Sequence, residues 1–109
     1  MSVSADEARR LALALPGAVE QDHHGRPSFR VGGRIFATLP DERTLNAMLD
    51  ADGIRTAVHD LPAACSERWW GTRLSAVQIS LDAIGPQQLA ALLADAWEHR
   101  AQARPARDR

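Results

Sequence analysis

The stretch RPSFRVGGRIFATL, residues 26–39, constrains the fold more than any other part of the chain. Its two halves are rich in apolar and aromatic residues, and Gly32 and Gly33 separate them. Glycine at both central positions of a two-residue turn tolerates the positive φ angles that a tight hairpin needs. The sequence therefore predicts an antiparallel hairpin, which pairs Val31 with Arg34, Phe29 with Phe36 and Pro27 with Thr38.

This register divides the hairpin residues between two sides, because successive side chains of a strand point to opposite faces of the sheet. Phe29 and Phe36 share one face, and we expect that face to pack against the core. The second face is mixed and partly exposed, and it places Arg26, Ser28 and Arg30 beside Ile35, Ala37 and Leu39.

Helical patterns occur at three places around the hairpin. A capping box begins at Ser4, and apolar residues then recur at helical spacing until Pro16-Gly17 ends the helix. A second helix follows a cap at Asp50 or Asp52. Pro86 suits the first position of a last helix, which carries the clearest apolar stripe in the chain.

Short strand-like runs account for most of the remaining chain. RTLNAMLD (43–50), CSERWW (65–70) and SAVQISL (75–81) are predicted strands, whereas AVEQDHHG (18–25) is expected to form a polar loop. The predicted order is helix, three strands, helix, two strands, helix. Short turns between strands favour an α+β fold, in which helices pack on one face of an antiparallel sheet.

The chain length and cysteine content limit the organisation. The 109 residues suit a single domain, predicted over residues 1–103, and an Arg-rich disordered tail at 104–109. The apolar runs are far shorter than the roughly 18 residues that a membrane span needs. Cys65 is the one cysteine, which excludes an internal disulfide and fits the reducing cytoplasm. The sequence leaves the oligomeric state open, with a monomer as the expectation.

Charge is distributed unevenly in a chain whose net charge is −1. Residues 23–39 contain three arginines and no acid, whereas residues 40–60 contain five acids and two arginines. A basic hairpin face is typical of weak, salt-dependent contact with double-stranded DNA, but strong binders make about 6–10 phosphate contacts. The alternative is that the arginines are solvated or paired with the acids of residues 40–60.

Metal-ligand and nucleophile patterns are weak. Asp22, His23 and His24 are consecutive, but neighbours on an extended chain point in opposite directions, and no HxH, HxxxH or CxxC spacing occurs. No GxSxG-type motif accompanies the serines, and Cys65 is expected to be a small packing residue. We therefore expect no metal site, no cofactor, no catalytic residue and no enzymatic activity.

The tryptophans divide into two groups. Trp97 completes the apolar stripe of the last helix and is expected in the core. Trp69 and Trp70 cannot both face inward from a strand, so one of them would be exposed or would line a groove in which a base or a flat ligand could stack. The alternative is a loop that buries both side chains against the sheet edge.

Several of these segments resemble one known family. LALALPGAVEQ, RPSFRVGGRIFATL, WWG and LAALLADAW together resemble the MmcQ/YjbR-like family of small bacterial proteins, over about residues 5–101. The resemblance implies a fold similar to that of the frataxin homologue CyaY and a double-wing mode of DNA binding. The first wing would be residues 26–39, and the second would lie within residues 65–81.

Two functions from different classes follow from the residues and the resemblance. The first is weak binding of double-stranded DNA through the wings, with Arg26, Arg30, Arg34, Arg68 and Arg73 as the candidate contacts. The second is a non-catalytic module that binds a small molecule or a partner protein in a pocket formed near His24, Trp69 and Trp70.

Overall fold

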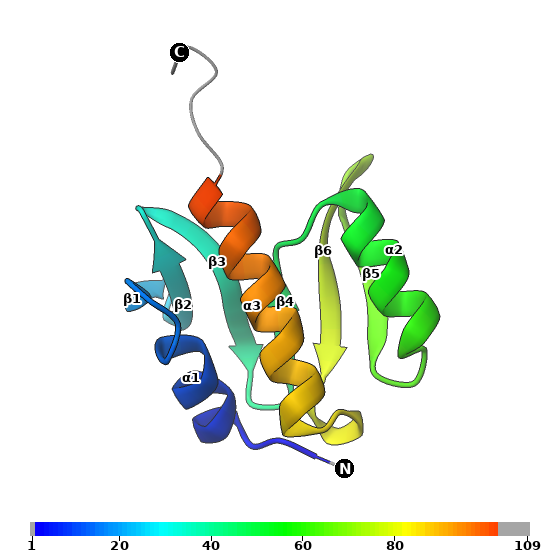
Figure 1. The fold of residues 1–109 in the computed structure, drawn as a ribbon, viewed down its shortest axis with the longest axis horizontal. Helices are drawn as coiled ribbons and strands as arrows, with labels where there is room; N and C mark the ends of the chain where they lie inside the picture. Colours follow the sequence, from blue (N-terminus) through cyan, green and yellow to red (C-terminus); the bar gives the residue numbers. More distant parts are fainter. Residues whose placement is uncertain (1, 103–109) are drawn as a thin grey trace.

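A single six-stranded antiparallel sheet organises the molecule, and its strand order is β1-β2-β3-β4-β6-β5 (Figure 1). The computed structural model describes residues 2–102, so the predicted tail at 104–109 lies outside the described residues. The strands are β1 (Val19–His23), β2 (Arg26–Val31), β3 (Arg34–Asp41), β4 (Thr44–Ala47), β5 (Cys65–Trp70) and β6 (Arg73–Ser80). The helices are α1 (Ala5–Leu13), α2 (Ala51–Asp60) and α3 (Pro86–Gln102), with a short 3-10 helix at Leu81–Ala83.

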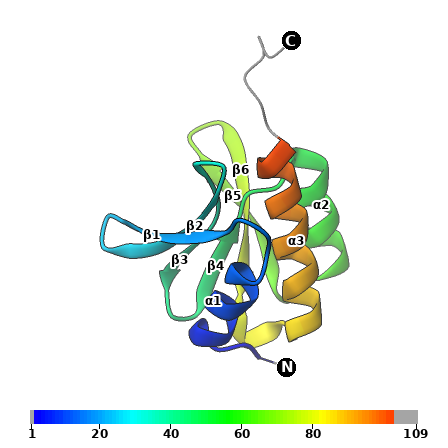
Figure 2. The same cartoon turned by 60° about the vertical axis from the view of Figure 1, so that its left-hand side comes forward.

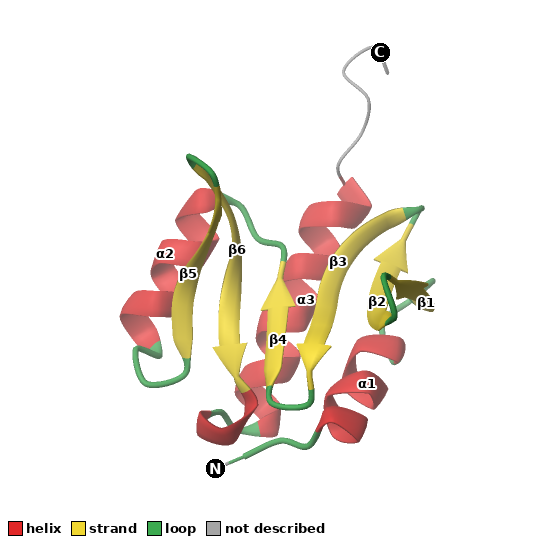
Figure 3. Ribbon diagram, turned by 180° about the vertical axis from the view of Figure 1, so that it is seen from behind, coloured by secondary structure: helices red, strands yellow, loops and turns green. Residues whose placement is uncertain are grey.

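The three helices lie on one side of the sheet, which confirms the predicted α+β class. Helix α3 packs against β3 and α1, and α2 packs against β5 and β6. Seen from behind, the strands lie in front and no helix of the described chain covers them (Figure 3). We call this uncovered side the open face and the other the helix face. No helix within residues 2–102 combines the length and the apolar character needed to cross a membrane.

Side-chain caps explain where the first two helices begin. Ser4 Oγ accepts a hydrogen bond from the N–H of Glu7 at 3.1 Å, which satisfies one of the free donors at the start of α1. Asp50 Oδ1 accepts from the N–H of Gly53 at 2.7 Å, so Asp50 and not Asp52 caps α2. The predicted start of the last helix at Pro86 is also confirmed.

The prediction of a polar loop at residues 18–25 is wrong, because the structure has strand β1 there. All five β1 residues are exposed, so the strand has no apolar alternation for a sequence pattern to detect. A two-residue turn joins it to β2, with positive φ at both His24 and Gly25. The left-handed backbone brings the rings of His23 and His24 to 4.5 Å edge to face, whereas an extended chain would separate them.

The predicted register of the central hairpin is correct only next to its turn. Val31 pairs with Arg34, but Phe29 pairs with Ala37 and not with Phe36. A β-bulge causes the shift by inserting one extra residue into β3, and the predicted pair of Pro27 with Thr38 is lost with it. The bulge also moves two residues predicted on the mixed face, Ala37 and Leu39, to the core side, where both are buried.

Trp97 lies beside the core and not at its centre. Its side chain is partly buried against the core residues. Its Nε1–H donates a 2.7 Å hydrogen bond to the carbonyl oxygen of Pro16, just after α1. Trp97 therefore joins α3 to the end of α1, whereas the sequence predicted a place in the centre of the helix–sheet contact.

Candidate functional site on the open face

The open face collects four of the five arginines that lie in the strands. A row of residues that pair directly across neighbouring strands crosses five strands on this side of the sheet. From β2 to β5 it consists of Ser28, Thr38, Asn46, Gln78 and Ser66. Residues at alternate positions along the same strands share the face, because side-chain direction repeats every second residue. By this register the open face receives Arg26 and Arg30 from β2, Arg68 and Trp70 from β5, and Arg73 from β6.

The acids of the same strands fall mainly on the helix face. Glu20 is opposite the core residue Phe29 and forms an ion pair with Arg9 of α1, at 3.0 Å from Oε1 to Nε. Glu67 lies 4.0 Å from Nε of Arg55 on α2. Strand alternation therefore places most of the strand arginines and most of the strand acids on opposite faces of the sheet. Asp41, at the end of β3, is occupied in the β3–β4 turn, where it accepts the N–H of Arg43.

The shortness of β4 opens the sheet between two hairpins. Beyond Ala47 the chain leaves the sheet, so β3 before Ala37 and β6 before Val77 have no strand between them. The N–H of Met48 donates to the carbonyl of Phe36 at 2.9 Å and fixes the chain at this gap. A bulge interrupts each flanking hairpin at this level, and bulges increase local twist. The β1–β2 and β5–β6 ends project away from the helices (Figure 2).

A pocket of about 540 Å³ occupies the gap. Its apolar wall combines Ile35 and Met48 with the indole of Trp70, whose residue is 56% exposed. Its polar wall comes from the β1–β2 hairpin and from the end of α3. The twelve lining residues contain no carboxylate: His23, His24, Arg26, Pro27, Arg30, Gly33, Ile35, Thr38, Pro40, Met48, Trp70 and Arg100.

The three arginines of this pocket are held by weak internal contacts only. Arg26 Nε donates to the carbonyl of Leu39 at 3.1 Å, and Arg30 Nε lies 3.5 Å from Ser28 Oγ. Arg100 Nε is buried and has no hydrogen-bond partner in the described chain. Burial, and to a smaller extent the charge of Arg34, lower the pKa of Arg100. Within residues 2–102 none of the pocket arginines forms an ion pair with a carboxylate.

Four of the predicted site residues meet in this pocket, and the other four do not. His24, Arg26, Arg30 and Trp70 line it, whereas Arg68 and Arg73 lie elsewhere on the open face. Arg34 pairs with the core residue Val31 and so lies on the helix side. Trp69 is also on the helix side, and its Nε1–H donates to Glu67 at 3.0 Å.

The pocket residues that were not predicted as site residues include Arg100, Met48 and Ile35. Arg100 follows the apolar stripe of α3 and carries no local signal, since only the tertiary structure brings it to the hairpin. Ile35 was assigned to the correct face of the hairpin, because the register beside the turn is regular.

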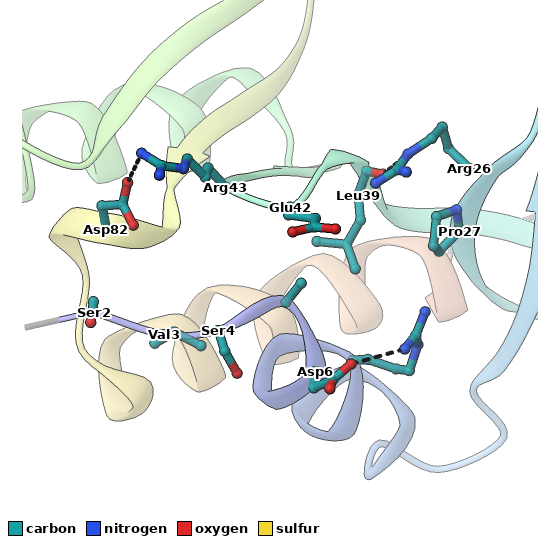
Figure 4. Close-up of a pocket in the computed structure, with 12 residues that line it drawn as sticks. Ser2, Val3, Ser4, Asp6, Arg26, Pro27, Leu39, Glu42, Arg43 and Asp82 are labelled. Atoms are coloured by element: carbon teal, nitrogen blue, oxygen red, sulfur yellow. Dashed lines mark hydrogen bonds and ion pairs between the residues drawn. The ribbon is translucent and has the colours of Figure 1, made fainter.

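A larger pocket of about 610 Å³ lies at the other end of the molecule, around the start of α1 (Figure 4). Its charges mostly neutralise one another: Asp6 contacts Arg9 at 3.2 Å, and Arg43 contacts Asp82 at 3.4 Å. Arg26 also reaches its rim, where the guanidinium bonds to the Leu39 carbonyl (Figure 4). Because most of its charged groups already have partners, this pocket is a weaker candidate for binding a charged ligand.

Two of the candidate nucleophiles, Cys65 and Ser28, are buried. Cys65 is in the core cluster, and desolvation raises the pKa of its thiol, which disfavours the reactive thiolate. Ser28 is fully buried and its hydroxyl donates to the carbonyl of Gln21 at 2.9 Å. Within residues 2–102 no three His, Cys, Asp or Glu side chains gather in an arrangement that could hold a metal ion.

Comparisons with known proteins identify the family and support the fold. The YjbR family model matches residues 13–99, so the chain belongs to the YjbR family. The crystal structure of the Deinococcus radiodurans protein DR2400, which carries the DUF419 domain, is similar with a TM-score of 0.71. That likeness covers 86% of this chain and 75% of the other at 19% sequence identity, and at this identity it shows the fold alone. No curated protein matches the chain.

Proposed function

We propose that this YjbR-family protein binds nucleic acid through its open face and contacts double-stranded DNA with the two hairpins that border it. The observation that carries the proposal is the separation of charge across the sheet. Arginines of β2, β5 and β6 share the uncovered face, while Glu20 and Glu67 pair with helix residues on the other side. Neutralising phosphates with arginine supplies most of the affinity in non-specific DNA binding.

The number of available guanidinium groups limits the strength of this binding. Arg26 and Arg30 lie towards one side of the open face, and Arg68 and Arg73 lie on the strands at the other side. Four contacts fall below the roughly 6–10 of a strong DNA binder, so the affinity should be weak and should fall steeply with salt. None of these side chains is positioned by a network that would read base edges, so little sequence preference is expected.

A titration of labelled duplex DNA at several salt concentrations tests the proposal. The double variant Arg30→Ala/Arg68→Ala should reduce the magnitude of the salt slope by about 2, because each phosphate contact contributes about 0.9. The matched control is Arg43→Ala/Arg55→Ala, which removes the same charge from two arginines that face Asp82 and Glu67. If the two variants lost equal amounts of the salt slope, net charge and not the open face would explain the binding, and the proposal would fail. The absence of any wild-type binding at low salt would also refute it.

The second candidate function is a non-catalytic binding module, and the pocket around Trp70 favours it. The indole is half exposed, and the guanidinium groups beside it have no carboxylate partner within residues 2–102. A ligand that covered this surface would bury apolar area and could pair with the charges. We propose a binding role in preference to catalysis because the one cysteine is buried and its thiol is held in the neutral form.

A further inference from the structure

The pocket between the two hairpins combines features that one ligand can satisfy together. The apolar side chains of Ile35 and Met48 and the indole of Trp70 line part of it. Its other lining residues include Arg26, Arg30 and Arg100, which carry the positive charge of the pocket. Its volume of about 540 Å³ lies within the range of about 300–1,000 Å³ that is common for small-molecule sites.

Among residues 2–102, no carboxylate lines the cationic part of the pocket or forms an ion pair with its arginines. A guanidinium group has five N–H donors, and the internal contacts of Arg26 and Arg30 use their Nε atoms alone. Arg100 is partly desolvated and stands close enough to Arg34 for their like charges to interact. An entering anion would therefore gain charge-assisted hydrogen bonds and relieve this repulsion, since guanidinium binds carboxylate and phosphate through paired donors.

The apolar part favours a flat ring. Trp70 is 56% exposed although it lies at the edge of a pocket, so stacking would bury indole surface that water now covers. Neighbouring Trp69 offers no such surface to the pocket, because it lies on the other side of β5 and donates to Glu67. A ring that stacks on Trp70 would place a substituent towards the arginines of β2 across the gap.

We infer that this pocket binds a small planar aromatic anion, a ring system that carries a carboxylate or a phosphate. The inference does not depend on the DNA proposal, but the two are linked in a testable way. Arg26 and Arg30 belong both to the pocket and to the basic surface of the open face. A ligand that occupies these guanidinium groups removes two phosphate contacts, so a bound anion should weaken any DNA binding.

Calorimetric titration of the intact chain with four probes tests the assignment. Naphthoate and adenosine monophosphate each carry a flat ring and an anionic group, whereas naphthalene methanol and adenosine keep the ring without the charge. We expect at least one of the two anions to bind at or below millimolar concentration, and its neutral partner to bind at least tenfold more weakly. Binding of the phosphate alone, or of the carboxylate alone, identifies the anionic group that the pocket accepts.

Three variants locate the binding. Trp70→Ala should weaken the anion about 5- to 100-fold, by analogy with the loss of stacking on bases. Trp69→Ala is the matched control and should change the affinity less than twofold. Arg30→Ala should lower affinity for the anions and leave the weak binding of the neutral probes unchanged. Retained thermal unfolding curves show that each variant is folded.

Four results would overturn the inference. The first is the absence of binding by both anions up to millimolar concentration, and the second is that the anion that binds does so no more tightly than its neutral partner. The third is equal loss of that anion's affinity in Trp69→Ala and Trp70→Ala, and the fourth is undiminished affinity for it in Arg30→Ala. The DNA proposal fails independently of these outcomes, because its readout is the salt slope of duplex binding. A protein that binds naphthoate but no duplex would retain the pocket and lose the DNA function.

Discussion

The two faces of the sheet are made from the same strands but have opposite physical characters. On the helix face, Phe29, Leu45 and Ile79 are fully buried, and Glu20 and Glu67 have arginine partners. On the open face the arginines have no carboxylate partners in the described chain, and Trp70 is half exposed. If the proposed binding roles hold, substitutions on the helix face should mainly affect stability and those on the open face should mainly affect binding.

The largest loss of stability should come from removing a buried side chain from the helix face. Phe29→Ala removes a fully buried ring from the core and should lower the free energy of unfolding by about 3–5 kcal/mol. Trp70→Ala on the open face is the control, and it should change stability by no more than about 0.5 kcal/mol. Denaturant unfolding measures both. Comparable losses would mean that Trp70 is a structural residue, and the division between the faces would fail.

A smaller loss of stability is expected at the boundary between two helices. Trp97→Ala removes a partly buried indole and its hydrogen bond to Pro16, and should cost about 2–3 kcal/mol. Trp97→Phe keeps most of the packing and loses the hydrogen bond, for which about 1 kcal/mol is expected. If Trp97→Phe were as damaging as Trp97→Ala, the hydrogen bond and not the packing would hold α3 to the end of α1.

The buried thiol on the helix face should make stability fall at alkaline pH. The chain contains no lysine and no tyrosine, so Cys65 is the one side chain besides the arginines that can titrate there. Burial raises the pKa of Cys65, so the unfolded chain loses its thiol proton first, and the folded state loses relative stability as pH rises above about 8.5.

Comparison of wild type with Cys65→Ala between pH 7.5 and 10 measures this contribution. Wild type should lose stability relative to the variant as the pH rises. A thiol reagent should also modify the native protein at least about tenfold more slowly than the unfolded chain. Parallel pH profiles and rapid labelling of the native protein would place Cys65 at the surface.

The helix face was largely predictable from the sequence, because burial leaves periodic patterns. Apolar spacing identified the three helices, Asp50 was one of two proposed caps, and the Gly32-Gly33 turn predicted the central hairpin. The strand at Val19–His23 was missed since none of its side chains is buried. The bulge in β3 was missed too, because an extra residue that follows from packing has no sequence pattern of its own.

The open face was predictable only in part. Arg26, Arg30, His24 and Trp70 were chosen from local features, and the structure brings them to one pocket. Their meeting depends on β4 ending at Ala47, which leaves the two hairpins without a strand between them. Arg34 and Trp69 were grouped with their sequence neighbours, but the structure places them on the helix side, because strand parity decides which face a side chain reaches.

The smallest effect should come from two arginines of one hairpin that lie four residues apart on opposite faces. Arg30 is on the open face near Ser28, whereas Arg34 is opposite Val31 and interacts with the charge of Arg100. Arg30→Ala and Arg34→Ala remove the same charge, and each should change the free energy of unfolding by no more than about 0.5 kcal/mol. Arg30→Ala should reduce the magnitude of the salt slope of DNA binding by about 1, and Arg34→Ala should leave it nearly unchanged. If both variants reduced the salt slope equally, DNA would contact the tip of the hairpin, which lies near both arginines. The open face would then not be the DNA-binding surface.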